Sequence, residues 1–228
     1  VFVFEALKQV KDGVQILAVL PEVLRSGTFS GHWREAIAKT ATINLVEPHG
    51  IFDETADIDV FVLGLTRRVS DKPNDVPWKQ AAKRSEKVVS NFFDVHVGRV
   101  VPHRDVETGA KLPYIHPRSV EPWTITADIS ESRRHFAPGY MAPFVVIRRT
   151  SRPEQPYRAV ATVVGGTKEV YVENHLIVCL PKDGKLASCL ELMAQLKNET
   201  VNLYLNERIR CRHLTVGAVS AIPLSWSI

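Results

Sequence analysis

The sequence is poor in cysteine and has no long apolar run, and each shortage excludes a class of protein. Its 228 residues include only three cysteines, Cys179, Cys189 and Cys211. These form no Cys-x-x-Cys pair and no regular spacing with histidines, which argues against a disulfide framework and a structural zinc site. No window of about eighteen residues is uncharged and apolar throughout, so we expect no membrane span. A reducing, cytoplasmic location is expected.

Groups for the common catalytic chemistries are also missing. Asp57 and Asp59 are the closest carboxylate pair, and strand alternation predicts that they share one face of an ordinary solvated edge. His96, His103 and His116 are spaced too irregularly for a metal site, so we expect them to pack or to contact phosphate. No nucleophile motif and no carboxylate trio for magnesium is found. We therefore expect no catalytic residue and no metal site in this chain.

Charge is distributed unevenly along the chain. The sequence has 29 Lys and Arg against 25 Asp and Glu, a net charge of +4. Residues 1–67 carry six basic and nine acidic side chains, so the rest of the chain has an excess of seven positive charges. The arginines are densest between Arg99 and Arg158. This basic part is a candidate for binding a polyanion, with an ordinary solvated surface as the alternative.

Residues 1–67 have the pattern of an α/β layer. Helical spacing of apolar residues predicts a first helix that Gly13 ends, and a second helix is predicted from Ser30 or Gly31 to about Thr40. The strands are predicted over residues 14–20, 42–47 and 60–65. Helix, strand, helix, strand, strand is typical of the α/β class.

The rest of the chain has a different order and spacing of predicted elements. Residues 68–90 are mostly polar and interrupted by prolines, which predicts a linker with a surface helix over about residues 80–88. Residues 91–228 have the pattern of an α+β domain. Strands are predicted over residues 92–97, 143–149, 157–164 and 170–180, followed by a helix over 186–196 and a further turn over 200–205.

Two local signals refine the α+β part. Gly165 and Gly166 lie between two predicted strands, which indicates a hairpin turn. Thr215 is expected to cap a short last helix that ends before Pro223.

Several short motifs occur together in an order typical of one family. In the first part they are Phe4-Glu5-Ala6-Leu7, Lys11-Asp12-Gly13, Val19-Leu20-Pro21-Glu22, Ser26-Gly27, Gly50-Ile51-Phe52 and Asp59-Val60-Phe61-Val62-Leu63. In the second part they are Pro113-Tyr114-Ile115-His116-Pro117-Arg118, Pro122-Trp123, Pro143-Phe144-Val145-Val146, Arg158-Ala159-Val160-Ala161, Asn174-His175-Leu176, Arg212-His213-Leu214-Thr215 and Ile222-Pro223-Leu224. Over nearly the whole chain they resemble an adenine-N6 DNA methyltransferase of the gamma, TaqI-like type.

The resemblance implies a fold and a function. Residues 1–67 would form the C-terminal half of a Rossmann-like methyltransferase sheet, residues 68–90 a linker, and residues 91–228 an α+β target recognition domain. The complete enzyme would transfer a methyl group from S-adenosylmethionine to adenine N6 in a specific duplex sequence by base flipping. Its expected partners are double-stranded DNA and the other subunits of a bacterial restriction-modification system, with no membrane.

The sequence also departs from the family in two motifs. The family binds S-adenosylmethionine through a Gly-containing loop after its first strand and holds the adenine amino group with an (Asn/Asp)-Pro-Pro-(Tyr/Phe) tetrapeptide. Neither motif occurs here. The chain begins at Val1 inside an apolar run, so we expect a C-terminal fragment that binds no cofactor and is inactive alone.

One aromatic residue has an expected role in the target-adenine pocket. In the family, the loop matching Gly50-Ile51-Phe52 provides a ring that stacks on the flipped adenine, and Phe52 is the matching position. Stacking on an aromatic face offsets part of the cost of removing a base from the duplex. The alternative is a phenylalanine that plugs the edge of the sheet.

Basic residues of the second part are the candidates for holding duplex DNA, through phosphate contacts or base reading. Arg118 and Arg158 coincide with family positions and are favoured. Arg148 and Arg149 are adjacent on a strand, so only one of the two is expected to face DNA. The full set of DNA-binding candidates is Arg99, Arg104, Arg118, Arg148, Arg149, Arg152, Arg158 and Lys168.

Two other functions are left open by the sequence. One is a stand-alone DNA-specificity subunit of a restriction-modification system, which would have no need of residues 1–67. The other is a structural or protein-interaction domain with incidental charge, for which no salt-dependent affinity for DNA is expected.

Overall fold

The computed structural model describes residues 2–53, 55, 56, 58–68, 78 and 87–225. The chain divides into two compact units, which we call unit 1 (residues 1–83 and 206–211) and unit 2 (residues 84–205 and 212–228). Unit 1 therefore includes a short segment from late in the sequence, which the boundaries expected from the sequence do not contain. The surface helix predicted over residues 80–88 lies almost wholly outside the described residues.

Unit 1 contains a three-stranded sheet in the order β1-β3-β2. Its strands are β1 (Gln15–Pro21), β2 (Ala41–Ile51) and β3 (Asp59–Arg67). The central strand β3 pairs antiparallel with both neighbours. All three strands lie where the sequence predicts them, although β2 is longer. The unit is of the α/β class, and since both of its strand pairings are antiparallel, the Rossmann-like arrangement stays a prediction.

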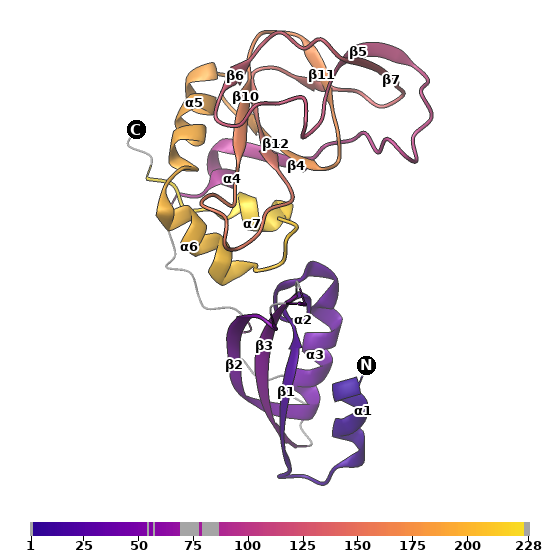
Figure 1. The fold of residues 1–228 in the computed structure, drawn as a ribbon, viewed down its shortest axis with the longest axis vertical. Coiled ribbons are helices and arrows are strands. Elements are labelled where there is room, and N and C mark those ends of the chain that lie inside the picture. The colour runs from indigo at the N-terminus through magenta and orange to yellow at the C-terminus, as the bar shows by residue number, and fades with distance from the viewer. Residues whose placement is uncertain (1, 54, 57, 69–77, 79–86, 226–228) are drawn as a thin grey trace. The chain divides into compact units, whose positions relative to one another are not determined.

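Two helices cover one face of this sheet (Figure 1). They are α1 (Phe2–Gln9) and α3 (Gly31–Thr40), and the short helix α2 (Glu22–Ser26) with a 3₁₀ turn (Thr28–Ser30) connects β1 to α3. Leu7 and Ile37 pack against Phe61 and Leu63 in the core. The predicted helix stop at Gly13 is not where α1 ends, because the helix already ends at Gln9; Gly13, with a φ of +85° that favours glycine, lies in the turn that leads into β1.

The opposite face of the unit 1 sheet is apolar and exposed. Leu17 and Val19 alternate with half-buried neighbours along β1 and are 73% and 55% exposed. Within the described residues, β1 is also an edge strand, because it pairs with β3 alone. Both properties are typical of a sheet that continues or is covered in a larger domain.

Unit 2 is built from two sheets. The first has the order β4-β12-β9-β10-β6, and the second has the order β7-β5-β11-β8. The strands of the first are β4 (Phe93–Val97), β12 (Leu176–Pro181), β9 (Phe144–Arg148), β10 (Ala161–Val164) and β6 (Ile125–Thr126). Those of the second are β7 (Ser132–His135), β5 (Ala110–Ile115), β11 (Glu169–Val172) and β8 (Tyr140–Met141).

Side chains from both sheets share one apolar core, to which β9 contributes Phe144 and Val146 and β11 contributes Val170 and Val172. Helix α5 (Leu186–Gln195) packs against β9 and β10. The remaining helices are α4 (Val89–Phe92), α6 (Glu199–Arg208) and α7 (Val216–Ser220). The Thr215 hydroxyl accepts a hydrogen bond from the Ala218 N–H at 3.1 Å, which confirms the predicted cap of the last helix. Among the described helices, none is long and apolar enough to cross a bilayer.

Two predictions for unit 2 are wrong. The single strand predicted over residues 170–180 is two strands, β11 and β12, which belong to different sheets and are separated by a turn at residues 173–175. The Gly165-Gly166 hairpin is also absent, because the flanking strands β10 and β11 lie in different sheets and do not pair. The φ of Gly166 is +90°, a backbone conformation that favours glycine, so a glycine is required at this position without a hairpin.

Candidate nucleic-acid interface

Unit 2 carries an open groove of about 1010 Å³. Its walls come from the 101–109 loop, the end of β5 and the turn after it, the start of β7, the end of β9 and the turn between β11 and β12. The charged and titratable residues that line it are His103, His116, Arg118, Glu131, Arg133, Arg148, Glu173 and His175. Three arginines and three histidines against two glutamates make this groove the main candidate for an anion site on the described surface.

A tight turn presents Arg118 at the groove. The Ser119 N–H donates to the His116 carbonyl oxygen at 3.0 Å, which closes a four-residue turn. Pro117 occupies the second position, where its fixed φ favours the turn. The Ser119 hydroxyl also accepts from the His116 N–H at 2.9 Å. Arg118 is exposed, and its guanidinium has no hydrogen-bond or ion-pair partner among the described residues.

Arg148 and Arg149 have different surroundings, as strand alternation requires. Arg148 ends β9 and lines the groove, where its Nη2 donates to the Val120 carbonyl oxygen at 3.2 Å. Arg149 donates from Nη1 to the Asn174 carbonyl oxygen at 3.3 Å. Arg148 is therefore the member of the pair that the structure places in the groove, and among the described residues its guanidinium donates to the Val120 carbonyl oxygen alone.

Glu131 is oriented by His116. The two carboxylate oxygens of Glu131 lie 3.0 and 3.2 Å from Nε2 of His116. The other ring nitrogen, Nδ1, lies 3.3 Å from the backbone N–H of Arg118 and accepts from it. The ring hydrogen is accordingly assigned to Nε2, where it is donated to Glu131.

Glu173 is held from two sides. It accepts from the Tyr114 hydroxyl at 3.0 Å and lies 2.6 Å from Nδ1 of His175. Burial and the neighbouring Glu173 carboxylate raise the pKa of Tyr114, so the hydroxyl stays protonated and acts as the donor. Both glutamates of the groove are thus bound to neighbouring donors, while Arg118 is not bound to an acid.

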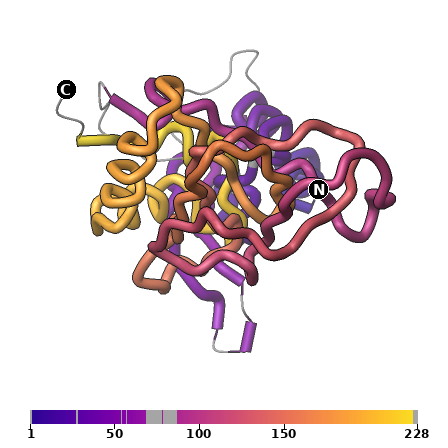
Figure 2. The backbone as a smooth tube through the Cα atoms, turned by 90° about the horizontal axis from the view of Figure 1, so that it is seen from above, coloured from indigo at the N-terminus to yellow at the C-terminus, as the bar shows by residue number. Residues whose placement is uncertain are grey.

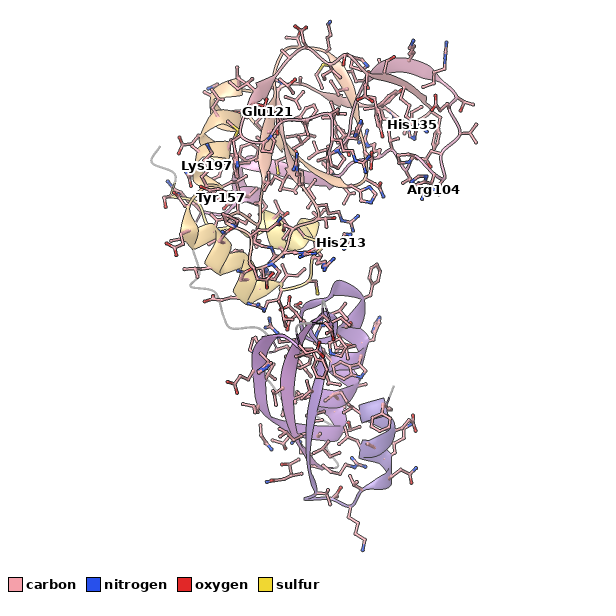
Figure 3. The ribbon with its side chains drawn as sticks, in the orientation of Figure 1. Arg104, Glu121, His135, Tyr157, Lys197 and His213 are labelled. Atoms are coloured by element: carbon pink, nitrogen blue, oxygen red, sulfur yellow. The ribbon has the colours of Figure 1, made fainter. Side chains whose placement is uncertain are left out.

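A second basic cluster adjoins the groove at the end of β9. The backbone of His213, which is labelled in Figure 3, pairs with that of Thr150. Burial lowers the pKa of His213, and the positive charges of Arg149, His175 and Arg212 lower it further. The guanidinium charges of Arg149 and Arg212 beside His213 give a positive local potential, which attracts anions.

The prediction that Arg158 contacts DNA is wrong. Its side chain is 0% exposed. Its Nε donates to the Ser151 hydroxyl at 3.0 Å, and its backbone N–H donates to Oδ1 of Asn202 at 2.7 Å. Arg158 therefore belongs to the interior of unit 2, where no phosphate can reach it.

The other predicted basic residues do not line the groove. Arg99 donates to the Pro138 carbonyl oxygen at 2.7 Å and lies over the Tyr140 ring at 4.5 Å. Arg152 is exposed. Lys168 lines a separate pocket of about 270 Å³ beside Gly165 and Gly166. For these residues, and for Arg104 and Arg149, contact with DNA stays a prediction.

One wall of the groove is fixed by a buried carboxylate. Asp105 accepts from the Val101 N–H at 2.7 Å, from Nε of Arg104 at 2.9 Å and from Nε2 of His135 at 3.2 Å. These hydrogen bonds, that of Val101 first, lower the pKa of Asp105 to about 2. Figure 3 shows Arg104 and His135 at the end of unit 2 that β5 and β7 form. The 101–109 loop, which contributes His103 to the groove, is held in place by this carboxylate.

Phe52 lies in the loop between β2 and β3, seen at the lower edge of Figure 2. Its ring is 56% exposed, so it does not plug the sheet edge. Oδ1 of Asp53 accepts from the hydroxyl and the N–H of Thr55 and from the Ala56 N–H, which lowers the pKa of Asp53 and orders the loop. The exposed ring is available for stacking, and that role stays a prediction.

Four residues that line the groove were not predicted from the sequence as site residues: Tyr114, Glu131, Arg133 and Glu173. Arg133 and Glu131 lie on or beside β7, a strand that was not predicted because its sequence, Ser-Arg-Arg-His, has no apolar alternation. The one signal visible in the sequence was the consecutive Arg133 and Arg134, of which the structure places Arg134 directly opposite Lys111 on β5. Like charges facing each other across two strands are unfavourable, which makes such a pair unusual in a purely structural sheet.

That this chain alone binds no S-adenosylmethionine stays a prediction. Neither the Gly-containing loop nor the (Asn/Asp)-Pro-Pro-(Tyr/Phe) tetrapeptide occurs in the sequence. The described residues also contain no group of three or more His, Cys, Asp or Glu that could hold a metal ion.

No protein-family model matches the sequence, and no curated protein matches it. The solved structure of the type IIG restriction endonuclease BpuSI is similar over 95% of this chain, with 11% sequence identity and a TM-score of 0.39. The chain spans 40% of the length of that structure. At this level, the similarity carries no argument about function.

Proposed function

We propose that this chain is the DNA-recognition part, with the end of the catalytic domain, of a site-specific adenine-N6 DNA methyltransferase of a restriction-modification system. The observation that carries the proposal is the basic groove of unit 2, where Arg118 and Arg148 offer unused N–H donors. Guanidinium groups on phosphates fix the register of a protein on duplex DNA, and groups on base edges read the sequence.

The rigidity of the groove supports this role. Arg118 comes from a hydrogen-bonded turn with proline at its second position, and the 101–109 loop is held by Asp105. Preformed walls lose little conformational entropy on binding, so more of the contact energy contributes to affinity. The proposed ligand of the groove is double-stranded DNA.

Unit 1 supports a methyltransferase part over a stand-alone specificity subunit. The exposed face with Leu17 and Val19, together with the free edge of β1, is typical of one layer of a larger α/β domain. A specificity subunit has no use for such a layer. In the complete enzyme, this layer would carry Phe52 to the flipped adenine, and the binding of S-adenosylmethionine would depend on residues outside this chain.

The proposal is tested by fluorescence anisotropy with a duplex that contains mixed adenine sites, titrated over a series of salt concentrations. The wild-type chain is compared with Arg118→Ala, Arg148→Ala and the control Lys185→Ala. Lys185 is an exposed cation at the start of α5 and does not line the groove. We expect the affinity to fall steeply with salt, and each groove variant that loses a phosphate contact to reduce the log–log slope by about 0.9. Absence of binding at low salt, or an equal effect of Lys185→Ala, would contradict the proposal.

The role of Phe52 is tested separately with a duplex that carries an extrahelical 2-aminopurine, whose fluorescence is quenched by stacking. We expect Phe52→Ala to reduce the quenching by the chain and Ile51→Ala, its exposed neighbour, to leave it unchanged. Equal quenching by wild type and Phe52→Ala would contradict the stacking role.

A further inference from the structure

We infer that Arg118 and Glu131 read base edges in the groove, Arg118 a guanine and Glu131 the amino group of a cytosine. This inference rests on the proposed function, because it requires the groove to hold duplex DNA. It assigns sequence reading to a particular donor and a particular acceptor, which the basic character of the groove does not do.

The carboxylate of Glu131 would be unfavourable in a site that contacts only phosphate. Its side chain is 50% exposed at the groove, whereas the other groove carboxylate, Glu173, is 14% exposed and paired with Tyr114 and His175. A carboxylate beside a phosphate is repelled, so it weakens a grip on the DNA backbone. On a base edge the same group is favourable, because Glu accepts a hydrogen bond from N4 of cytosine in the major groove.

His116 makes Glu131 a preorganised acceptor. The single N–H at Nε2 is shared between the two carboxylate oxygens at 3.0 and 3.2 Å. A carboxylate has about four lone-pair positions, so this contact leaves acceptor positions open to the groove. The carboxylate is thus fixed in direction and still able to accept from a base.

The same imidazole supports the donor. Nδ1 of His116 accepts from the backbone N–H of Arg118 at 3.3 Å, and His116 opens the turn on which Arg118 stands. The Arg118 guanidinium has no partner among the residues described, and its two parallel N–H groups match O6 and N7 of guanine. One histidine therefore supports a donor for guanine and an acceptor for cytosine. Arg148, which already donates to a backbone carbonyl, is the better candidate for a phosphate contact.

The test is selection of bound sequences from a pool of duplexes with a randomised region, using the full 228-residue chain. Wild type is compared with Glu131→Gln, Glu131→Asp and Arg118→Gln. The control is Glu35→Gln, which removes the same charge from another acid beside a histidine, at 3.8 Å from His32 on α3 and outside the groove. Thermal unfolding of each variant verifies that it is folded.

We expect the wild-type chain to select a sequence with fixed G·C positions. Glu131→Gln should lose discrimination at one cytosine by about 5- to 150-fold while keeping or raising the affinity for unrelated duplexes, since a negative charge is removed. Arg118→Gln should lose discrimination at a guanine, and Glu35→Gln should select the wild-type sequence.

The outcomes separate this inference from the proposed function. If the wild-type chain binds no duplex, the proposed function and the inference both fail. If it binds with a sequence preference that folded Glu131→Gln and Glu131→Asp retain, or binds without any preference, the inference is wrong and the proposed DNA binding stands. Loss of discrimination at one base position in both Glu131 variants supports the inference.

Discussion

Replacing two arginines that look equivalent in the sequence should have opposite consequences. Arg118 and Arg158 both belong to the basic part of the chain, but the first is exposed at the groove and the second is 0% exposed inside unit 2. We expect Arg158→Ala to destabilise the fold and Arg118→Ala to weaken DNA binding without destabilising it.

The magnitudes follow from what each side chain contacts. Arg158→Ala empties a buried space, and truncating a large buried side chain costs about 2–5 kcal/mol. The Ser151 hydroxyl also loses its partner at 3.0 Å, which adds about 1–3 kcal/mol if it stays unsatisfied. The resulting loss of about 3–8 kcal/mol is a large part of the 5–15 kcal/mol that typically stabilises a domain. Arg118→Ala should change the free energy of unfolding by less than about 0.5 kcal/mol.

The assay is urea unfolding followed by circular dichroism, with anisotropy measured on the same samples. Arg158→Ala should lower the urea midpoint, and Arg118→Ala should leave it unchanged while reducing DNA affinity by about 1–3 kcal/mol if Arg118 reads a base. The matched control Arg158→Lys keeps the charge and part of the volume. If Arg158→Ala unfolds at the wild-type midpoint and loses DNA affinity, the reasoning from burial is refuted.

Three further predictions concern pH and the exposed sheet face. The pKa of Asp105 is about 2 in the folded chain against an ordinary value of 3.8, so its contribution to stability is present above about pH 4 and is lost as the pH falls toward 2. Asp105→Asn should therefore lower the melting temperature at neutral pH, and the difference from wild type should shrink as the pH falls from about 4 to 2. Bound phosphate should raise the lowered pKa of His213, so DNA affinity should increase as the pH falls from about 8 to 6, and less so in His213→Gln. Leu17→Lys and Val19→Lys should reduce the binding of a hydrophobic dye with less than about 0.5 kcal/mol change in stability, whereas Leu63→Lys on the buried face should unfold unit 1.

Each of these three has a result that counts against it. A constant stability difference between wild type and Asp105→Asn from neutral pH to pH 2 would mean that the carboxylate is not ionised in the folded loop. An unchanged pH dependence in His213→Gln would remove His213 from the interface. Strong destabilisation by Leu17→Lys would show that this face is packed.

The sequence predicted unit 1 better than unit 2, and the reason is the range of the contacts. Helix α3 and strands β1 and β3 each carry a local periodicity, so their positions can be read from neighbouring residues. Strands β5 and β7 depend on pairing with each other and on β11, and their sequences contain proline or consecutive arginines instead of alternation. Their hydrogen-bonding partners are distant in sequence, and no local pattern records them.

The candidate site could be predicted in part for the same reason. Arg118 was favoured because it matches a position of the family that the chain resembles, and the structure presents it on a turn closed between His116 and Ser119. Glu131 was missed because its relation to His116 exists only after β5 and β7 pair. Arg158 was misplaced because the burial of an arginine depends on its tertiary environment, and arginine is normally exposed.

The segment 206–211 has a consequence for how this chain can be divided. Within unit 1, the carbonyl oxygen of Glu207 accepts from the buried Arg25 guanidinium, and Arg210 pairs with Asp59 at 3.2 Å. An N-terminal fragment that stops at residue 83 would lack both contacts and expose a buried Arg25. The remaining fragment, residues 84–228, would carry the missing piece, so the two fragments should reassociate when mixed. Dividing the chain at residue 83 would therefore separate unit 1 from a part of its own structure.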